Sequence, residues 1–250
     1  MRYIERLPLP PDTVRGLAVR QERVDRLKAS GTLEPIKEWD SGRKLKSVKT
    51  AHAVLRRMAG ETERCMYCQD SHGTDIEHFK PKARFPGTMY HWENMLLCCT
   101  ECGRFKGEEY PCTRDGSPLL IDPSKEDPWE YLDFEQRTGN ITARYSRDRN
   151  EYSPKGIETV KILHLDRRGA LSSLYRKSNK TLVEKVYTLI GVTIKDVEEE
   201  ASKLIDIDFA GLLGWYIHGS GIHEDPFPLL KERQPLLWEA LDRKIGRPDG

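Results

Sequence analysis

The sequence predicts a mainly α-helical protein with a small α+β core and a helical C-terminal region. Apolar residues recur at helical spacing in two stretches before residue 60 and in several more after residue 153. Between them, two Cys-x-x-Cys pairs bracket residues 69–98, which contain a short strand-like run. The 250 residues, 37% of them hydrophobic and 32% charged, are enough to bury a sizeable core in one large domain or two small ones.

Residues 1–60 are predicted to form an N-terminal helical segment that packs on this core. Prolines disfavour helix at the start of the chain, and Asp12 or Thr13 can cap a helix that ends near Ser30. A second helix is expected to open at Ser41-Gly42 and to end near Ala59. Each of the two helices has one apolar face, which is typical of helices that pack against other elements.

Basic residues gather in the second helix and in the cysteine-rich segment that follows it. Residues 41–107 hold 12 Lys and Arg against 7 Asp and Glu, whereas residues 108–250 hold 21 against 26. The formal net charge of +1 therefore conceals a basic segment and an acidic tail. Such a run is either a solvated face or a contact with the phosphate backbone of nucleic acid. The helix residues expected at such a contact are Lys44, Lys46 and Lys49.

After the cysteine-rich segment, residues 61–115, a connector is expected over residues 116–150. Prolines and glycines mark loops there, and the run 119–121 is either a short strand or a tether packed on the core. Residues 129–145 predict a hairpin that turns at Gly139.

Residues 151–250 are predicted to form a helical C-terminal region. Helices in this number favour a bundle, and its apolar stripes form either core or a partner-binding surface. The ranges expected to be helical begin at Pro154, span 167–190, run from about Thr193 to Leu204, and then cover 209–218 and 226–245.

The two cysteine pairs predict one structural zinc site. Cys65, Cys68, Cys99 and Cys102 supply four thiolates, and each x-x gap lets one turn present two sulfurs to a tetrahedral ion. Cys98 can replace Cys99, but only Cys99 has the x-x spacing to Cys102. Disulfides and buried free thiols are the alternatives.

Between the pairs lie an acid, a histidine and an asparagine that together indicate phosphodiester hydrolysis. That reaction needs a base for water and a cation for the charge that develops on phosphate. His78 can be the base, and Glu77 or Asp75 can hold a hard divalent ion such as Mg²⁺. Asn94 can hydrogen-bond to His78 and fix its ring.

Basic side chains follow both parts of this constellation. A loop shaped by prolines comes directly after His78, and a helix comes after Cys99. Their cations are either near the scissile phosphate or solvated. The residues expected to contact nucleic acid here are Lys80, Lys82, Arg84, Arg104 and Lys106.

The segment resembles the HNH (ββα-metal) endonucleases in their zinc-stapled form. The family pattern acid–His–hydrophobic–x–Pro matches residues 77–81, its Asn-Leu-like part matches 94–97, and its Cys-x-x-Cys-Asn-x-x-Lys-Gly part matches 99–107. The resemblance implies a zinc-stapled ββα-metal module. In that module His78 is the general base and Asn94 is the residue that orients it.

By the same resemblance, Glu77 is a ligand of a catalytic Mg²⁺ or Mn²⁺ ion. One position departs from the pattern, because the family has Asn or His directly after the last cysteine as the final ligand and this chain has Gly103. Either another group (Asp75, His91 or Glu101) fills the role, or metal binding is weak, or the site is degenerate. The last alternative predicts a catalytically decayed module that binds nucleic acid or serves as an adaptor.

A narrower resemblance is to the HNH subunit of Septu-type and retron-linked antiphage systems, the PtuB-like proteins. It depends on residues 76–82, on Tyr90-x-Trp92-x-Asn94, on residues 120–123 and on the leucine-rich tail. It implies a nuclease that works with a PtuA-like ABC/SMC ATPase subunit. Phage DNA is the first expected substrate, and tRNA and a retron complex are the alternatives that the retron-linked relatives imply.

The sequence also predicts a cytoplasmic protein that does not contact a membrane. No apolar run approaches the roughly 18 residues of a membrane span, and the first residues lack the apolar region of a secretory signal. A reducing compartment favours metal binding over disulfides for six cysteines with this spacing.

Overall fold

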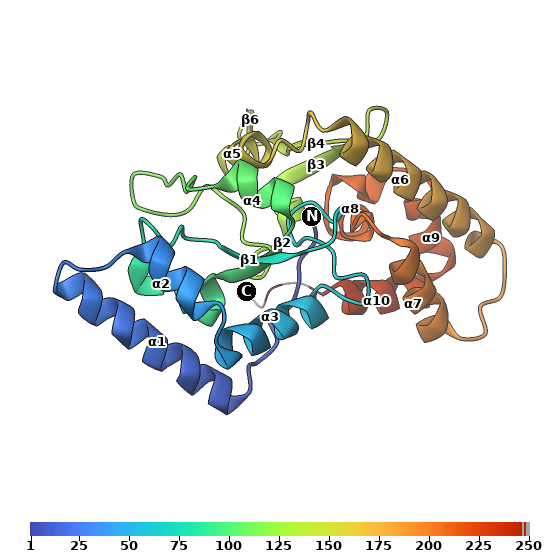
Figure 1. Ribbon diagram of the computed structural model, residues 1–250. Coiled ribbons are helices and arrows are strands. Elements are labelled where there is room, and N and C mark those ends of the chain that lie inside the picture. The colour runs from blue at the N-terminus through green and yellow to red at the C-terminus, as the bar shows by residue number, and fades with distance from the viewer. Residues whose placement is uncertain (247, 249–250) are drawn as a thin grey trace. The chain divides into compact units, whose positions relative to one another are not determined.

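The computed structural model describes residues 1–246 and 248 and divides into two compact units. The first, which we call the cysteine-rich unit, comprises Arg6–Met66 and Ser71–Gly116. The second, the C-terminal unit, comprises Met1–Glu5, Tyr67–Asp70 and Ser117–Gly250. Helices dominate both units, and the strands form small antiparallel pairs (Figure 1).

The cysteine-rich unit contains a two-stranded hairpin that leads directly into a short helix. The two strands are antiparallel, and their register pairs Asp75 with Cys98 and His78 with Met95. The element order in this segment is strand, strand, helix. The elements of the unit are α1 (Pro11–Ala29), α2 (Pro35–Gly42), α3 (Lys46–Met58), β1 (Asp75–His78), β2 (Met95–Cys98) and α4 (Thr100–Lys106), with 3₁₀ turns at Pro86–Thr88 and Trp92–Asn94.

The predicted first helix is present as α1, but the expected caps are wrong, because Asp12 and Thr13 lie inside the helix and Pro10 is at the N-cap position. Pro11 stands in its first turn, where the missing N–H has no intrahelical partner to lose. Its buried residues, spaced three and four apart, are Thr13, Leu17, Gln21 and Val24. A glutamine therefore stands in the buried stripe between two aliphatic residues.

The predicted second helix is only partly correct, because its start lies inside another helix. α2 ends at Gly42, and α3 begins at Lys46. A Cβ atom at Gly42 would lie 1.8 Å from the Tyr90 hydroxyl, so the close approach of this ring requires glycine there. Helix α2 was not predicted, although Pro35 in its first turn is a sequence signal for a helix start. The helix buries Trp39.

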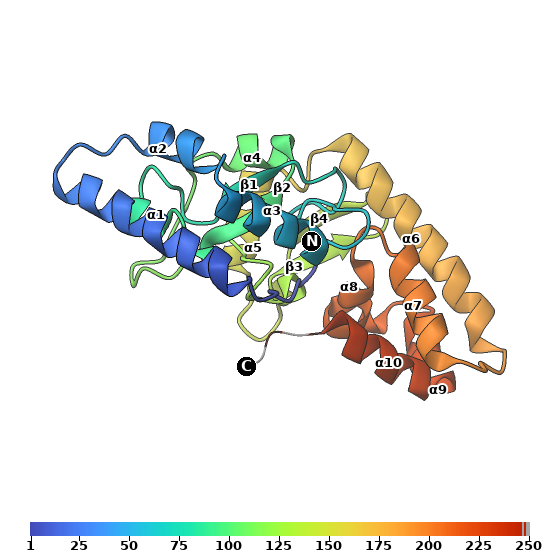
Figure 2. The same ribbon diagram turned by 60° about the horizontal axis from the view of Figure 1, so that its bottom comes forward.

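The C-terminal unit combines two small hairpins with a set of helices. Its strands are β3 (Leu132–Glu135), β4 (Asn140–Ala143), β5 (Tyr145–Ser146) and β6 (Glu151–Tyr152). Its helices are α5 (Pro154–Leu163), α6 (Gly169–Ile190), α7 (Val197–Ile207), α8 (Leu212–His218), α9 (Phe227–Arg233) and α10 (Pro235–Ile245), with 3₁₀ turns at Pro128–Glu130 and Ser220–His223. Figure 2 shows α6 and α7 beside α9 and α10. Helix α6 contacts α7 and α9, and α10 contacts α7 and α9.

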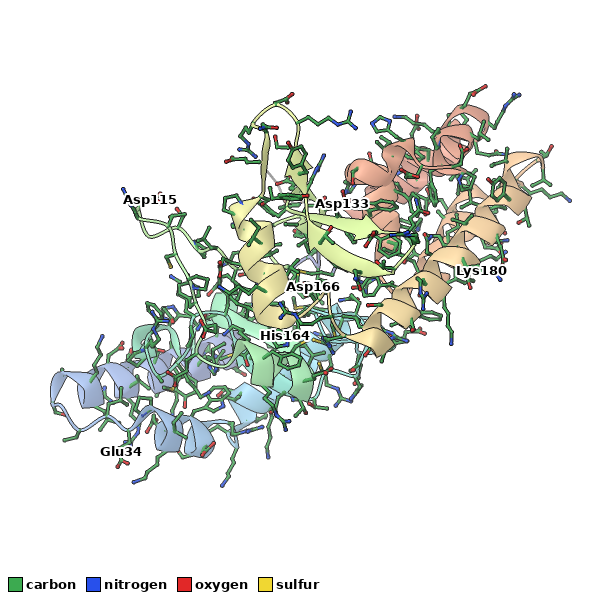
Figure 3. The ribbon with its side chains drawn as sticks, turned by 90° about the horizontal axis from the view of Figure 1, so that it is seen from above. Glu34, Asp115, Asp133, His164, Asp166 and Lys180 are labelled. Carbon is green, nitrogen blue, oxygen red and sulfur yellow. The ribbon has the colours of Figure 1, made fainter. Side chains whose placement is uncertain are left out.

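The predicted hairpin within residues 129–145 is confirmed as β3 and β4. Gly139 at its turn has a φ of +81°, and a Cβ atom there would lie 2.1 Å from the carbonyl oxygen of Ser172. Figure 3 shows Asp133 on this hairpin, where its carboxylate accepts from Trp215 Nε1 and Ser220 Oγ. The run 119–121 forms no strand and is the expected tether, with the Ile121 N–H donating to Thr159 Oγ1.

Several boundaries in the predicted helical tail are wrong: α8 begins at Leu212 rather than at residue 209, and two further differences have a local cause. The helix expected from about residue 193 begins at Val197, because the Asp196 side chain caps it by accepting from the Glu199 N–H. The range 226–245 is two helices, since Pro235 cannot donate the N–H that a continuous helix needs. α5 ends at Leu163, and His164, labelled in Figure 3, adopts a left-handed conformation with a φ of +52°.

Within residues 1–246 and 248, no helix has both the length and the apolar content needed to cross a membrane.

Candidate active site and metal centre

The four cysteines of the two Cys-x-x-Cys pairs lie together and are buried. Their Sγ atoms all lie within 4.8 Å of one another. A tetrahedral zinc ion with Zn–S distances of about 2.3 Å requires sulfurs at this kind of spacing. The four cysteines therefore fit a zinc ion. Among the described residues, they are the one group of three or more His, Cys, Asp or Glu side chains that lie close enough together to hold an ion.

Local structure brings the second cysteine pair to this place. β2 ends at Cys98, and Cys99 is the N-cap of α4, where its Sγ accepts from the Cys102 N–H at 3.4 Å. The first turn of α4 thereby puts both sulfurs on one side of the helix. All four cysteines are free thiols, so the disulfide alternative is not the one that the structure adopts.

Cys98 lies beside the cluster but is not a member of it. Its Sγ contacts the Cys99 carbonyl oxygen at 3.3 Å, and a hydrogen bond with Cys65, a further one with Cys99 and burial all raise the pKa of the Cys98 thiol. The structure thus favours Cys99 over Cys98 as the ligand.

His78 is the last residue of β1, and its side chain is almost completely enclosed. The residue is 2% exposed, and the Trp39 ring meets the imidazole edge-on at 4.3 Å between centroids. Nε2 lies 2.9 Å from the Met89 carbonyl oxygen. A carbonyl can only accept, so Nε2 carries the proton and Nδ1 keeps its lone pair. Burial, aided by the Lys82 charge, lowers the pKa of His78 to about 3, so the imidazole is neutral at physiological pH.

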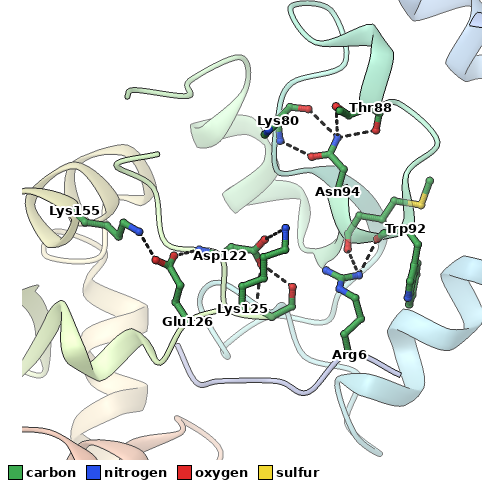
Figure 4. Close-up of polar contacts among 11 residues, drawn as sticks. Arg6, Lys80, Thr88, Trp92, Asn94, Asp122, Lys125, Glu126 and Lys155 are labelled. Atoms are coloured by element: carbon green, nitrogen blue, oxygen red, sulfur yellow. Dashed lines mark hydrogen bonds and ion pairs between the residues drawn. The ribbon is translucent and has the colours of Figure 1, made fainter. Parts of the chain in front are cut away.

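Asn94 has a different role from the one expected. We predicted that its side chain would bond to the His78 ring. Instead its Oδ1 accepts from the Lys80 N–H at 2.7 Å, and its Nδ2 donates to the carbonyl oxygens of Lys80 and Thr88 (Figure 4). Asn94 therefore ties together both ends of the loop that leaves β1, and Nε2 of His78 has the Met89 carbonyl oxygen as its partner instead.

Glu77 makes a buried ion pair that the sequence did not reveal. Its carboxylate is 19% exposed, and Oε1 accepts from Lys106 Nζ at 2.9 Å. Lys106 is fully buried and also donates to the His78 carbonyl oxygen at 2.8 Å. Burial raises the pKa of Glu77 and the Lys106 charge opposes that shift. Lys106 is thus enclosed with Glu77, and it does not belong to the solvent-exposed basic surface on which we had placed it.

Gly103 stands next to the other oxygen of this carboxylate. A Cβ atom at Gly103 would lie 3.5 Å from Glu77 Oε2 and 3.8 Å from Cys98 Sγ. The resemblance assigns the final metal ligand to this position. Gly103 is therefore adjacent to Glu77 but has no side chain that could bind a metal. Glu77 is thus a single carboxylate whose Oε2 faces Gly103, and a carboxylate oxygen is a ligand type that Mg²⁺ and Mn²⁺ accept.

The other candidate ligands do not gather at Glu77. Asp75, two residues earlier on β1, is exposed and forms an ion pair with Arg43. His91 is exposed and lines a groove of about 420 Å³ against α1, and Glu101 is exposed in the first turn of α4.

Most of the predicted basic contacts are on the surface. The exposed residues are Lys44, Lys46, Lys49, Lys80 and Arg104, and Lys82 is half-buried; the structure records no acidic partner for these six. Arg84 is exposed and donates to the Glu108 carbonyl oxygen. Lys82 also lies close enough to lower the pKa of both Glu77 and His78.

Three residues that support His78 were missed at the level of sequence. Trp39 covers the ring, Met89 accepts from it through a backbone atom, and Gln21 bonds to the segment that carries Met89. The acceptor from Met89 is a backbone carbonyl oxygen, which every residue type has, so the sequence could not predict this contact. Gln21 did carry a signal, since a polar residue in a buried helical stripe requires hydrogen-bond partners.

Comparison with known proteins adds two relatives, both named Septu protein PtuB. The relative from Bacillus mycoides (strain KBAB4) is 25% identical over 188 residues, which cover 58% of this chain and 61% of the relative. The relative from Bacillus thuringiensis is 27% identical over 109 residues, which cover 41% of this chain and 37% of the relative.

The chain spans less than two thirds of the length of either relative. No family model matches it, and no solved structure matches it significantly. Both relatives carry the same name, and this chain is similar to them over the matched 188 and 109 residues.

Proposed function

We propose that the chain is the HNH-type endonuclease subunit of a Septu-type antiphage complex and that it hydrolyses phosphodiester bonds in nucleic acid. The observation that carries the proposal is His78. It is a neutral imidazole with one proton fixed on Nε2 and its Nδ1 lone pair unused, and it lies next to an acidic residue at the end of a hairpin strand. The strand–strand–helix order and the four-cysteine cluster support the same assignment.

In the proposed reaction His78 acts as the general base. Nδ1 takes a proton from water while the water oxygen attacks phosphorus, and the bond from phosphorus to the leaving oxygen breaks. The Met89 carbonyl oxygen holds Nε2–H throughout, and it stabilises the imidazolium that forms. Cys65, Cys68, Cys99 and Cys102 would hold a zinc ion outside the reaction, and that ion would tie the start of α4 to the turn at residues 65–68.

Glu77 is the residue that would hold a catalytic Mg²⁺ or Mn²⁺ ion. Such an ion, when bound, neutralises the charge that develops on the phosphate. Lys106 keeps the Glu77 carboxylate in place through Oε1. Lys82, whose charge acts on both Glu77 and His78, contributes a second positive charge near the reacting phosphate.

The enclosure of His78 indicates that the site is closed in the isolated chain. A phosphodiester cannot reach a side chain that is 2% exposed unless the covering residues move. We therefore propose that a PtuA-like ABC/SMC ATPase partner gates the nuclease, and that the isolated subunit cuts slowly or not at all. Phage DNA is the first proposed substrate, and tRNA, cut within a retron complex, is the second.

A cleavage assay with the assembled complex tests this function. The chain is co-expressed with a PtuA-like ATPase, and the purified complex is incubated with Mg²⁺ or Mn²⁺ and with separate pools of plasmid DNA and tRNA. Cleavage of either pool that disappears in His78→Ala, with zinc content unchanged, establishes the nuclease and identifies its substrate. Equal cleavage by the two proteins would show that His78 is not the base.

A second function is favoured by one observation, the absence of a side chain at Gly103 beside Glu77. A decayed site would leave a zinc-stapled module that binds nucleic acid or serves as an adaptor for the ATPase. A complex with full zinc content that binds nucleic acid, yet cuts neither pool with either ion, would support this reading.

A further inference from the structure

The Met89 carbonyl oxygen, the partner of the His78 ring, belongs to a segment that is tied down on both sides. On one side, Asn94 Nδ2 donates to the Thr88 carbonyl oxygen at 3.0 Å. On the other side, the Tyr90 N–H donates to Gln21 Oε1 at 2.8 Å. Residues 88 and 90 flank Met89 directly, so these two amide side chains fix the direction in which its carbonyl points.

Gln21 makes this contact from α1, far from His78 along the chain. Its side chain is 6% exposed and all of its polar atoms are bonded. Nε2 donates to the Pro86 carbonyl oxygen and to Asp25 Oδ1, each at 3.0 Å. Two acceptors facing Nε2 and one donor facing Oε1 leave a single orientation for the amide, because a flipped amide would turn its NH₂ group toward the Tyr90 N–H.

The contacts of Gln21 span the segment that contains Met89. Pro86 precedes Met89 by three residues and Tyr90 follows it by one, so one carboxamide closes residues 86–90 into a fixed bend. The segment is short, and a 3₁₀ turn occupies its first three residues. Packing alone does not require an amide here, because an apolar side chain of similar length would fill the same stripe between Leu17 and Val24.

We propose that Gln21 is a positioning residue for His78, which acts through the backbone of residues 86–90. The amide holds the Met89 carbonyl where it accepts Nε2–H, and it thereby fixes which ring nitrogen keeps the lone pair and where that lone pair points. The effect on catalysis rests on the proposed nuclease function. The effect on the ring tautomer does not.

The first test is spectroscopic and needs no activity. In full-length protein labelled with ¹⁵N, the ring nitrogens of His78 are assigned by their loss in His78→Ala. Wild type is expected to show the separated nitrogen shifts of a single Nε2–H tautomer. In Gln21→Met, which keeps the length of the side chain and removes both hydrogen-bonding groups, we expect the two shifts to move toward each other as both tautomers become populated.

A matched control comes from Gln234 in the C-terminal unit. Its Nε2 donates to the carbonyl oxygens of Leu189 and Val192, each at 2.8 Å, so it is also an amide that clamps backbone. Gln234→Met removes a similar clamp elsewhere and is expected to leave the His78 shifts at their wild-type values. Unchanged His78 shifts in folded, zinc-loaded Gln21→Met overturn the proposal, and so do equal changes in both variants.

Gln21→Glu keeps the acceptor that faces the Tyr90 N–H and removes the donor that faces the Pro86 carbonyl oxygen. This variant replaces Gln21→Met in the test if Gln21→Met fails to fold. A carboxylate still accepts from the Tyr90 N–H but cannot donate to the Pro86 carbonyl oxygen or to Asp25 Oδ1, so the two His78 shifts are again expected to move toward each other. Wild-type shifts in this variant would then count against the proposal. In the complex, Gln21→Met is expected to lower kcat by up to about 100-fold with KM unchanged, the scale of a displaced reacting group. If wild type cuts nothing, the proposed function fails, and the nitrogen shifts still decide the positioning role.

Discussion

Lys106 and Glu77 form a buried ion pair in which one ammonium group also holds the backbone of the next residue. Nζ lies 2.9 Å from Glu77 Oε1 and 2.8 Å from the His78 carbonyl oxygen. The side chain of Lys106 is fully buried, and its ammonium group therefore bonds α4 to the last two residues of β1. This contact joins the helix that carries Cys102 to the strand that carries the proposed base.

Removal of the lysine should be costly because a carboxylate would stay behind in a largely dry site. We expect Lys106→Met to lower the free energy of unfolding by about 3–5 kcal/mol, the usual cost of leaving a buried charge unpaired. Adding Glu77→Gln should recover part of this loss, since the uncompensated charge is then gone. Urea unfolding of the four proteins of the cycle gives the coupling energy. Strictly additive effects would show that the two residues do not interact.

The cysteine cluster makes a second prediction that separates two adjacent residues. Cys99→Ser should release zinc and unfold the cysteine-rich unit, because apparent zinc-linked folding energies are roughly 10–16 kcal/mol. Cys98→Ser should keep full zinc content, since Cys98 lies outside the cluster. Zinc per chain is measured by elemental analysis, with Cys112→Ser as the exposed control. Loss of zinc from Cys98→Ser but not from Cys99→Ser would exchange their roles.

The buried His78 predicts a loss of stability in acid. Its pKa is about 3 in the folded protein against 6.5 for an unperturbed histidine, so below pH 6.5 the unfolded chain binds a proton that the folded chain does not. Stability should therefore fall as the pH drops from 6.5 toward 3. The contribution reaches about 2 kcal/mol at pH 5 and about 4 kcal/mol near pH 3.

Denaturant unfolding at pH 7 and pH 5, in excess zinc, measures this term. His78→Gln should lose less stability between the two values than wild type does, by about 2 kcal/mol. His72, whose side chain is 57% exposed, supplies the control His72→Gln. An identical pH dependence for wild type and His78→Gln would mean that His78 is not buried as a neutral group.

The four-cysteine cluster was predictable because its geometry is local. A Cys-x-x-Cys turn and the first turn of α4 determine where the sulfurs of Cys99 and Cys102 lie, whatever the rest of the chain does. Helix α1 and the β3–β4 hairpin were predictable for the same reason, since periodicity and turn residues act over a few positions.

The contacts around His78 were not predictable, because each joins segments that are distant in sequence. Lys106 follows Cys102 by four residues and was taken for a surface residue, yet its partner Glu77 lies on β1. Asn94 was expected at the imidazole, but the backbone of Met89 occupies that position and Asn94 closes the preceding loop instead. A sequence pattern records neither backbone acceptors nor the burial of a lysine.

The exposed lysines at the start of α3 lead to a final prediction about nucleic-acid binding. Lys44, Lys46 and Lys49 are exposed, and the structure gives none of them an acidic partner. If all three contact phosphate, their replacement by alanine should weaken binding and reduce the slope of log K against log salt by roughly 2–3, because each phosphate contact contributes about 0.7–0.9.

The matched control removes three exposed lysines that already have ion-pair partners, namely Lys37, Lys161 and Lys203. Both triple variants change the net charge equally, so a general charge effect would lower the affinity of both to the same extent. Affinity for a short duplex, measured by fluorescence anisotropy over a range of salt concentrations, should change its slope only in the α3 variant. Equal slopes in wild type and the α3 variant would place the nucleic-acid contact elsewhere on the chain.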